Sequence, residues 1–207
     1  MRAMYLMISL QQGEPYAGWA DQYTVDDLKP AHARSYEPRS VNTGTTVRLV
    51  NLMMDYYKLT ADTRFLSGIP AAIRFLESMK LPESDVKKWK SQSTNPEAIL
   101  VPRFVDPDTG KPLYVHRKGS NVKNGTYYID QNIENTIGHY NSATFVNPSE
   151  LRRRYEEVKK IPVSELAKNS PFLQDQLVPL PKYYTRLRGK ATEEVARGLV
   201  KSLTKDG

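Results

Sequence analysis

The chain has 207 residues, of which 39% are hydrophobic and 26% are charged, a balance that suits one folded domain and excludes a disordered segment. Lysine and arginine number 30 against 23 aspartate and glutamate, giving a net charge of +7. That charge favours an anionic partner, although it equally suits plain solubility. The absence of cysteine excludes disulfides, thiolate catalysis and cysteine-ligated metal sites.

The opening MRAMYLMISLQQ combines one arginine with a short apolar run. No small-x-small cleavage site follows it, so we predict a packed helix over residues 2–11 rather than a signal peptide. No apolar stretch approaches the ~20 residues that a bilayer-spanning helix needs.

Residues 18–40, GWADQYTVDDLKPAHARSYEPRS, collect aromatic, proline and arginine side chains without a helical or strand period. We predict an irregular loop that extends to about Gly44. A loop of this composition is better suited to touching a ligand than to filling a core.

Helical patterns follow this loop. TTVRLVNLMMDYYKLT has a wide apolar stripe from Val47 to Tyr57, which predicts a helix buried on most of its circumference. Asp62 can cap the short turn DTRFLSG, and Pro70 suits the first turn of a helix over PAAIRFLESMK. These segments predict helix pairs joined by short loops, a helical-layer architecture.

The pattern changes near residue 98. Two short apolar runs flank a Pro-Asp-Thr-Gly turn in AILVPRFVDPDTGKPLYVHRKG, which predicts a β-hairpin. The turn superficially resembles a calcium-binding loop. The EF-hand pattern, however, needs an oxygen ligand where Gly110 stands and a glutamate where Arg117 stands, so we reject that interpretation.

The C-terminal third predicts two more helices. NPSELRRRYEEVKK has Asn147 as a cap with Glu150 placed to reach back. Glu156 and Glu157 follow the arginine run 152–154 at helical spacing, which favours a solvated face over a nucleic-acid site. Residues 169–190 are polar and Pro-rich, with PLPKYYTRLRGK expected to extend over the surface, and TEEVARGLVKSLTKDG predicts a closing amphipathic helix.

The stretch QQGEPYAGWADQYTVDDLKPAHARSYEPRS resembles the pectic acid lyases, polysaccharide lyase family 10. The family pattern is roughly Q…W-x-x-Q-Y-D…L-x-P-x-x-A-R-x-[YF]-E-x-P-S, and the positions that fit it are Trp19, Gln22, Tyr23, Leu28, Pro30, Ala33, Arg34, Tyr36, Glu37 and Ser40. The helices after the loop and the hairpin VPRFVDPDTGKPLYVHRKG are also similar to the family. The resemblance covers most of the chain and is strongest over residues 11–117.

The resemblance implies a mainly α fold, an (α/α) toroid-type helical domain with a β-hairpin and long loops. Residues 1–207 would then form a single domain matching the C-terminal part of the family's catalytic module, incomplete at the N-terminus. Two departures stand out. NTGTT follows Ser40 where the family tends to carry an acidic residue, and the family's calcium-holding acidic residues lie upstream of Trp19, with no counterpart here.

The chemistry that the resemblance implies is calcium-assisted β-elimination of polygalacturonate, with Ca2+ ligands that this chain does not reveal. Arg34 would be the base and Arg117 a clamp on a substrate carboxylate, a role that a planar, permanently charged guanidinium suits. The alternative for Arg34 is an ion pair with Glu37 that fixes the loop. For Arg117 the alternative is a surface cation at the hairpin end.

Further substrate contacts are expected from the same loop. Trp19, Tyr23 and Tyr36 could stack on sugar faces, with loop packing as the alternative and the favoured one for Trp19. Lys29 would add positive potential toward an anionic polymer. His32 and His116 flank the two arginine motifs and could tune the site.

The expected partner is an acidic polysaccharide, polygalacturonate, with no nucleic acid and no membrane, and the expected state is a monomer that is secreted or periplasmic. A rival hypothesis is a non-catalytic helical module that binds acidic glycan without the metal half of the site. A hydrolytic toroid enzyme would need a separated carboxylate pair, and adjacent Asp26 and Asp27 do not suit that geometry. Nucleic-acid binding lacks a recognisable motif.

Overall fold

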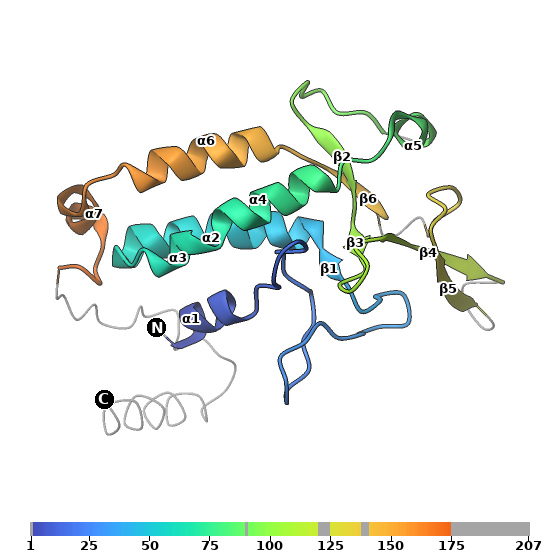
Figure 1. Cartoon of the computed structure of the whole chain (residues 1–207), viewed down its shortest axis with the longest axis horizontal. Helices are drawn as coiled ribbons and strands as arrows, with labels where there is room; N and C mark the ends of the chain where they lie inside the picture. The colour runs from blue at the N-terminus through green and yellow to red at the C-terminus, as the bar shows by residue number, and fades with distance from the viewer. Residues whose placement is uncertain (1, 90, 120–124, 138–140, 175–207) are drawn as a thin grey trace, which may run out of the picture.

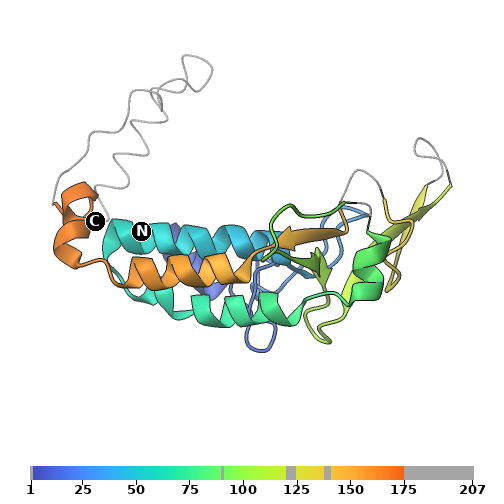
Figure 2. The same ribbon diagram turned by 90° about the horizontal axis from the view of Figure 1, so that it is seen from above.

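The fold is that of a computed structural model, which describes residues 2–89, 91–119, 125–137 and 141–174. Its helices and strands are segregated along the long axis of the molecule. Most helices lie together at one end, and the strands gather at the other end with one short helix (Figures 1 and 2). The long loop that follows the first helix runs along this boundary toward the strands (Figure 1).

The helical end is built around three long helices that contact one another, α2, α4 and α6. Shorter helices cover them: α1 and α3 on one side and α7 at the far end (Figure 1). The helices are α1 (Arg2–Ser9), α2 (Thr43–Thr60), α3 (Arg64–Ser67), α4 (Ile69–Ser78), α5 (Glu83–Lys88), α6 (Pro148–Lys159) and α7 (Val163–Asn169). None of the helices in the described ranges is long and apolar enough to cross a membrane.

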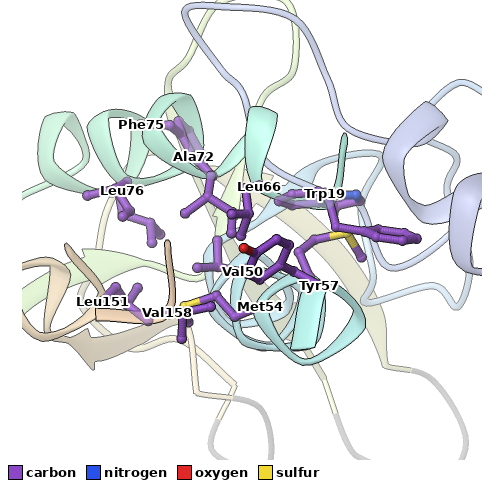
Figure 3. Close-up of a cluster of buried hydrophobic side chains, with 14 of the residues drawn as sticks. Trp19, Val50, Met54, Tyr57, Leu66, Ala72, Phe75, Leu76, Leu151 and Val158 are labelled. Atoms are coloured by element: carbon purple, nitrogen blue, oxygen red, sulfur yellow. The ribbon is translucent and has the colours of Figure 1, made fainter. Parts of the chain in front are cut away.

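The main hydrophobic core lies between these helices. Val50 and Met54 of α2 are fully buried, and Leu76 of α4 and Leu151 of α6 meet them there (Figure 3). Trp19 enters the same core from the loop, so the loop is fastened to the helical layer (Figure 3).

Two antiparallel sheets form the other end of the molecule. The larger sheet has the order β1-β3-β4-β5 and the smaller pairs β2 with β6. Their strands are β1 (Val41–Asn42), β2 (Ile99–Pro102), β3 (Phe104–Val105), β4 (Pro112–Lys118), β5 (Thr126–Asp130) and β6 (Ala143–Val146). Because β1 directly precedes α2, the sheet and the helical layer share a continuous segment of chain.

The expectation of a mainly α toroid-type domain is wrong. Of the described residues 40% are helical and 16% are in strands, so the fold is mixed α and β. The predicted hairpin exists as β3 and β4, but it is extended by β1 on one side and β5 on the other. β1 and the β2–β6 sheet arise from pairings between distant segments, Val41 with Val105 and Ile99 with Val146, whereas β5 follows β4 in the chain.

The predicted helices are largely confirmed. Asn42 caps α2 by accepting the Thr45 N–H at 3.1 Å, and Asn147 caps α6 by accepting the Glu150 N–H at 2.9 Å. The Glu150 carboxylate pairs with Arg153. The predicted closing helix, the end of the Pro-rich segment and His139 lie outside the described residues.

Candidate functional site

Trp19 anchors the long loop inside the protein. Its side chain is 1% exposed, and its indole N–H donates to the Met7 carbonyl at 2.7 Å. Its backbone N–H donates to the Thr46 hydroxyl at 3.1 Å, and its backbone pairs with Asn42 in an isolated bridge. A ring buried to this degree offers no face to a sugar. Trp19 therefore packs the loop onto the core, which was the favoured alternative to a substrate contact.

Tyr23 and Lys29 shape the next part of the loop. The Tyr23 hydroxyl accepts the Ala20 N–H at 2.7 Å and donates to the Leu10 carbonyl at 2.8 Å, and burial raises its pKa to about 12. The exposed Lys29 ammonium lies 2.9 Å from Asp27. Both expected substrate contacts therefore already have partners within the protein, Ala20 and Leu10 for Tyr23 and Asp27 for Lys29.

Arg34 lies at the surface. Its side chain is 67% exposed, and its Nη1 lies 3.4 Å from Oε1 of Glu37. Glu37 also accepts the Arg34 backbone N–H at 3.2 Å, while its own N–H donates to the Arg34 carbonyl at 2.8 Å. The ion pair expected as the alternative is thus present. It fixes a tight turn and leaves most of the guanidinium surface open to solvent.

Tyr36 brings this turn against the β4–β5 hairpin. Its ring centroid lies 5.5 Å from that of Tyr127, with the ring planes tilted by 58°. Tyr36 also packs against a small buried cluster that includes Phe104 and Val115. The loop that carries Arg34 is therefore held on one particular face of the hairpin.

Arg117 belongs to that same face. It is paired across the sheet with Tyr127, and residues at two-residue spacing on a strand point to the same side. Val115, two positions before Arg117, is in the cluster that Tyr36 packs against. Because Arg34 is two residues from Tyr36, the fold brings the two arginine motifs to one surface, around an aromatic patch.

Arg103 is a further cation at this patch, and sequence reasoning did not single it out. Its guanidinium carbon lies 5.9 Å from the Phe104 ring centroid, and its Nη1 donates to the Asn141 carbonyl at 3.3 Å. Arg103 is half-buried between β2 and β3. The signal was present in the quoted motif VPRFV, where Arg103 directly precedes the aromatic residue.

The far end of the loop is fixed to the β3–β4 turn by a forked ion pair. Arg39 Nη1 and Nη2 lie 2.6 and 3.0 Å from the two carboxylate oxygens of Asp108. This hydrogen bonding raises the pKa of Arg39 and lowers that of Asp108. Asp106 accepts the N–H groups of Asp108 and Thr109 at 2.9 Å, so the turn that superficially resembled a calcium loop folds on itself.

The two histidines differ in their surroundings. His32 is exposed on the loop, whereas His116 is 4% exposed on β4. As for the calcium implied by the resemblance, no group of three or more aspartate, glutamate or histidine side chains in the described ranges could hold a metal ion. The donors that the described residues present at the patch are cationic and aromatic, which suits an anionic ligand better than a cation.

Comparison with known proteins agrees with the resemblance. No curated protein matches the chain. The sequence profile of one family, described as pectic acid lyase, matches residues 4–140. This range covers more than half of the chain and includes the loop, α2 to α4 and the β4–β5 hairpin with every candidate arginine. The chain belongs to the pectic acid lyase family.

Proposed function

We propose that this chain cleaves polygalacturonate as a pectate lyase by β-elimination, with Arg34 as the base and Arg117 as the carboxylate clamp, in the manner of polysaccharide lyase family 10. The family assignment supports a lyase at the coarse level. One structural observation supports the specific proposal: the Tyr36–Tyr127 contact joins the turn that carries Arg34 to the strand pair that carries Arg117.

The elimination needs two groups from the protein, one that binds the substrate carboxylate and one that acts as the base. Arg117 binds a uronate carboxylate and stabilises the negative charge that spreads onto it when C5 is deprotonated. Arg34 removes the C5 proton. The electron pair of the C5–H bond then forms the C4–C5 double bond, the C4–O bond breaks, and the departing oxygen takes a proton from water.

Glu37 makes the base role demanding. A neighbouring carboxylate favours the charged guanidinium, and only the neutral form can accept a proton. The Glu37 contact is long for a charge-assisted hydrogen bond and the Arg34 side chain is 67% exposed, so we expect substrate to reach the guanidinium from the solvent side. We therefore expect turnover to rise toward alkaline pH, where the neutral form becomes more populated.

Calcium is retained in the proposal as the family's cofactor. When bound, the ion would neutralise substrate carboxylates and so make the C5 proton more acidic. The described residues form no cluster of ligands for calcium, so the proposed steps are assigned to protein side chains alone.

The second candidate function is a module that binds acidic glycan without cleaving it. Two observations favour it: Glu37 holds Arg34 in the form that binds carboxylates, and no metal-holding cluster exists in the described part of the chain. Both candidates bind polygalacturonate, so turnover separates them.

The test follows the ultraviolet absorbance of the unsaturated product from polygalacturonate with added calcium. Loss of a positioned base costs about 10²–10⁴-fold, so Arg34→Ala should abolish measurable turnover while leaving the fold intact. Arg117→Ala removes a charge-assisted hydrogen bond and should lower kcat/KM about tenfold or more. Arg152→Ala on α6, which removes an exposed pair with Glu77, is the matched control and should be neutral.

Two outcomes contradict the proposal, the first its choice of base and the second the lyase activity itself. Unchanged turnover in Arg34→Ala removes that residue from the mechanism. Binding of polygalacturonate by the unaltered chain without any unsaturated product, at all calcium concentrations and at alkaline pH, supports the binding module.

A further inference from the structure

The β4–β5 hairpin has a second face that the proposed site does not use. Residues alternate along a strand, so Lys118 and His116 point away from the side that carries Arg117. Tyr128 of β5 is paired directly with His116 and shares this second face. Since β5 is the last strand in the sheet order, its outer edge has no strand partner among the described residues.

His116 is held rigidly beneath this face. Its Nε2 lies 2.8 Å from Oδ1 of Asp130 and 3.0 Å from the Asn132 carbonyl, and its Nδ1 lies 3.3 Å from the Asn135 carbonyl. These contacts fix the ring through both of its nitrogens. With both nitrogens engaged and 4% exposure, the imidazole is a fixed, buried support.

Tyr128 lies on that support and faces solvent. Its ring is stacked on His116 with centroids 5.1 Å apart and planes inclined by 19°, yet the residue is 42% exposed. The Lys118 ammonium lies 5.5 Å from the Tyr128 ring centroid. Lys118 is exposed, and within the described ranges it has no carboxylate partner. An oriented aromatic ring with the Lys118 ammonium over it, 5.5 Å from its centroid, is thus presented outward.

We propose that Tyr128 and Lys118 form an accessory subsite for a uronate unit of an acidic polysaccharide. The C–H face of the sugar would pack on the Tyr128 ring while its carboxylate meets the Lys118 ammonium. The inference rests on the proposed function for the identity of the polymer. Arg117 and Lys118 are consecutive residues on opposite faces, so a polymer that crosses the open edge of β5 would meet both sites.

The test compares binding of polygalacturonate, digalacturonate and neutral galactan by calorimetry at one ionic strength, with circular dichroism to verify folding. Tyr128→Ala should weaken binding of polygalacturonate about three- to tenfold, and Lys118→Gln about two- to fivefold. Neither should change binding of digalacturonate, which is too short to span both sites. Tyr128→Phe keeps the ring and should bind like the unaltered chain. Lys111→Gln, at the other end of β4, is the control for loss of one positive charge.

The subsite is refuted if Tyr128→Ala and Lys118→Gln both bind polygalacturonate as tightly as the unaltered chain does. It is equally refuted if they weaken digalacturonate by the same factor, or if neutral galactan binds as well as the acidic polymer. Product formation by the unaltered chain and by Arg34→Ala is read in parallel. If the chain yields no product but shows the predicted length-dependent binding, the proposed lyase function is refuted and the proposed subsite is supported.

Discussion

The contact between Tyr36 and Tyr127 can be tested as the structural link that brings the two arginines to one face. Tyr36→Leu removes the ring but keeps an apolar side chain, and a tilted aromatic pair contributes about 0.5–1.5 kcal/mol beyond its burial. Tyr36 is half-buried, so lost burial adds about 1 kcal/mol at most. We expect a loss of about 1–2 kcal/mol in the free energy of unfolding, measured by urea denaturation.

The functional loss should be larger than the loss of stability suggests. Displacement of a catalytic group by about 1 Å can cost about 10²-fold in rate, and Arg34 is fixed to the hairpin through this contact. In the still-folded Tyr36→Leu variant, kcat/KM on polygalacturonate should therefore fall about 10- to 100-fold.

A double-mutant cycle and a matched control variant test whether this contact positions Arg34. Tyr36→Leu and Tyr127→Leu should couple by about 0.5–1.5 kcal/mol. Tyr56→Leu breaks a similar pair with Phe65, centroids 5.4 Å apart at 65°, on the helical layer, and should lower stability without lowering kcat/KM of the folded protein. Additive effects of the first two substitutions, or equal activity loss in Tyr56→Leu, would show that the contact does not position Arg34.

Two further predictions concern the supports of the loop and of α1. Gly110 has φ +69°, and an added Cβ would lie 2.2 Å from the Tyr16 ring, so Gly110→Ala should lower the free energy of unfolding by more than about 1 kcal/mol. Gly13→Ala is the control, because a Cβ there meets nothing within 4 Å. Equal urea midpoints for the two variants would contradict this prediction. Hydrogen bonds from Arg64 hold the pKa of Asp62 well below its ordinary value, so the stability from this carboxylate is present above pH ~4 and is lost as pH falls further. In Asp62→Asn, the thermal midpoint should therefore fall less steeply as the pH is lowered from neutral than it does in the unaltered chain. The same pH dependence in both proteins would contradict this prediction.

Local patterns in the sequence predicted the helices well. The apolar stripe from Val47 to Tyr57 and the cap at Asn147 depend on residues within a few positions of one another, which a sequence displays directly. The short strands were missed for the opposite reason. A two-residue strand such as β1 has no period of its own, and its partner Val105 lies far along the chain.

The candidate residues could be named from the sequence, but their arrangement in space could not. The sequence indicated Arg34, Tyr36 and Arg117, but nothing local shows that Tyr36 meets Tyr127 across most of the described chain. Trp19 illustrates the other limit. An indole needs an apolar surface and an acceptor for its N–H whether it binds sugar or anchors a loop, and only the fold shows that the acceptor is the Met7 carbonyl.

The arrangement also supports the proposed acidic sugar over another anionic ligand. A polyuronate presents both carboxylates and C–H faces, so a surface that recognises it needs cations next to exposed aromatic rings. The first face offers Arg34 and Arg117 around the Tyr36–Tyr127 pair, and the second offers Lys118 beside Tyr128. Phosphate-rich ligands would use the same cations but gain nothing from the rings as C–H acceptors. Replacing the tyrosines at each face should therefore weaken binding of a polyuronate but not of a phosphate-rich ligand, whereas replacing Arg34 and Arg117 at the first face, or Lys118 at the second, should weaken both.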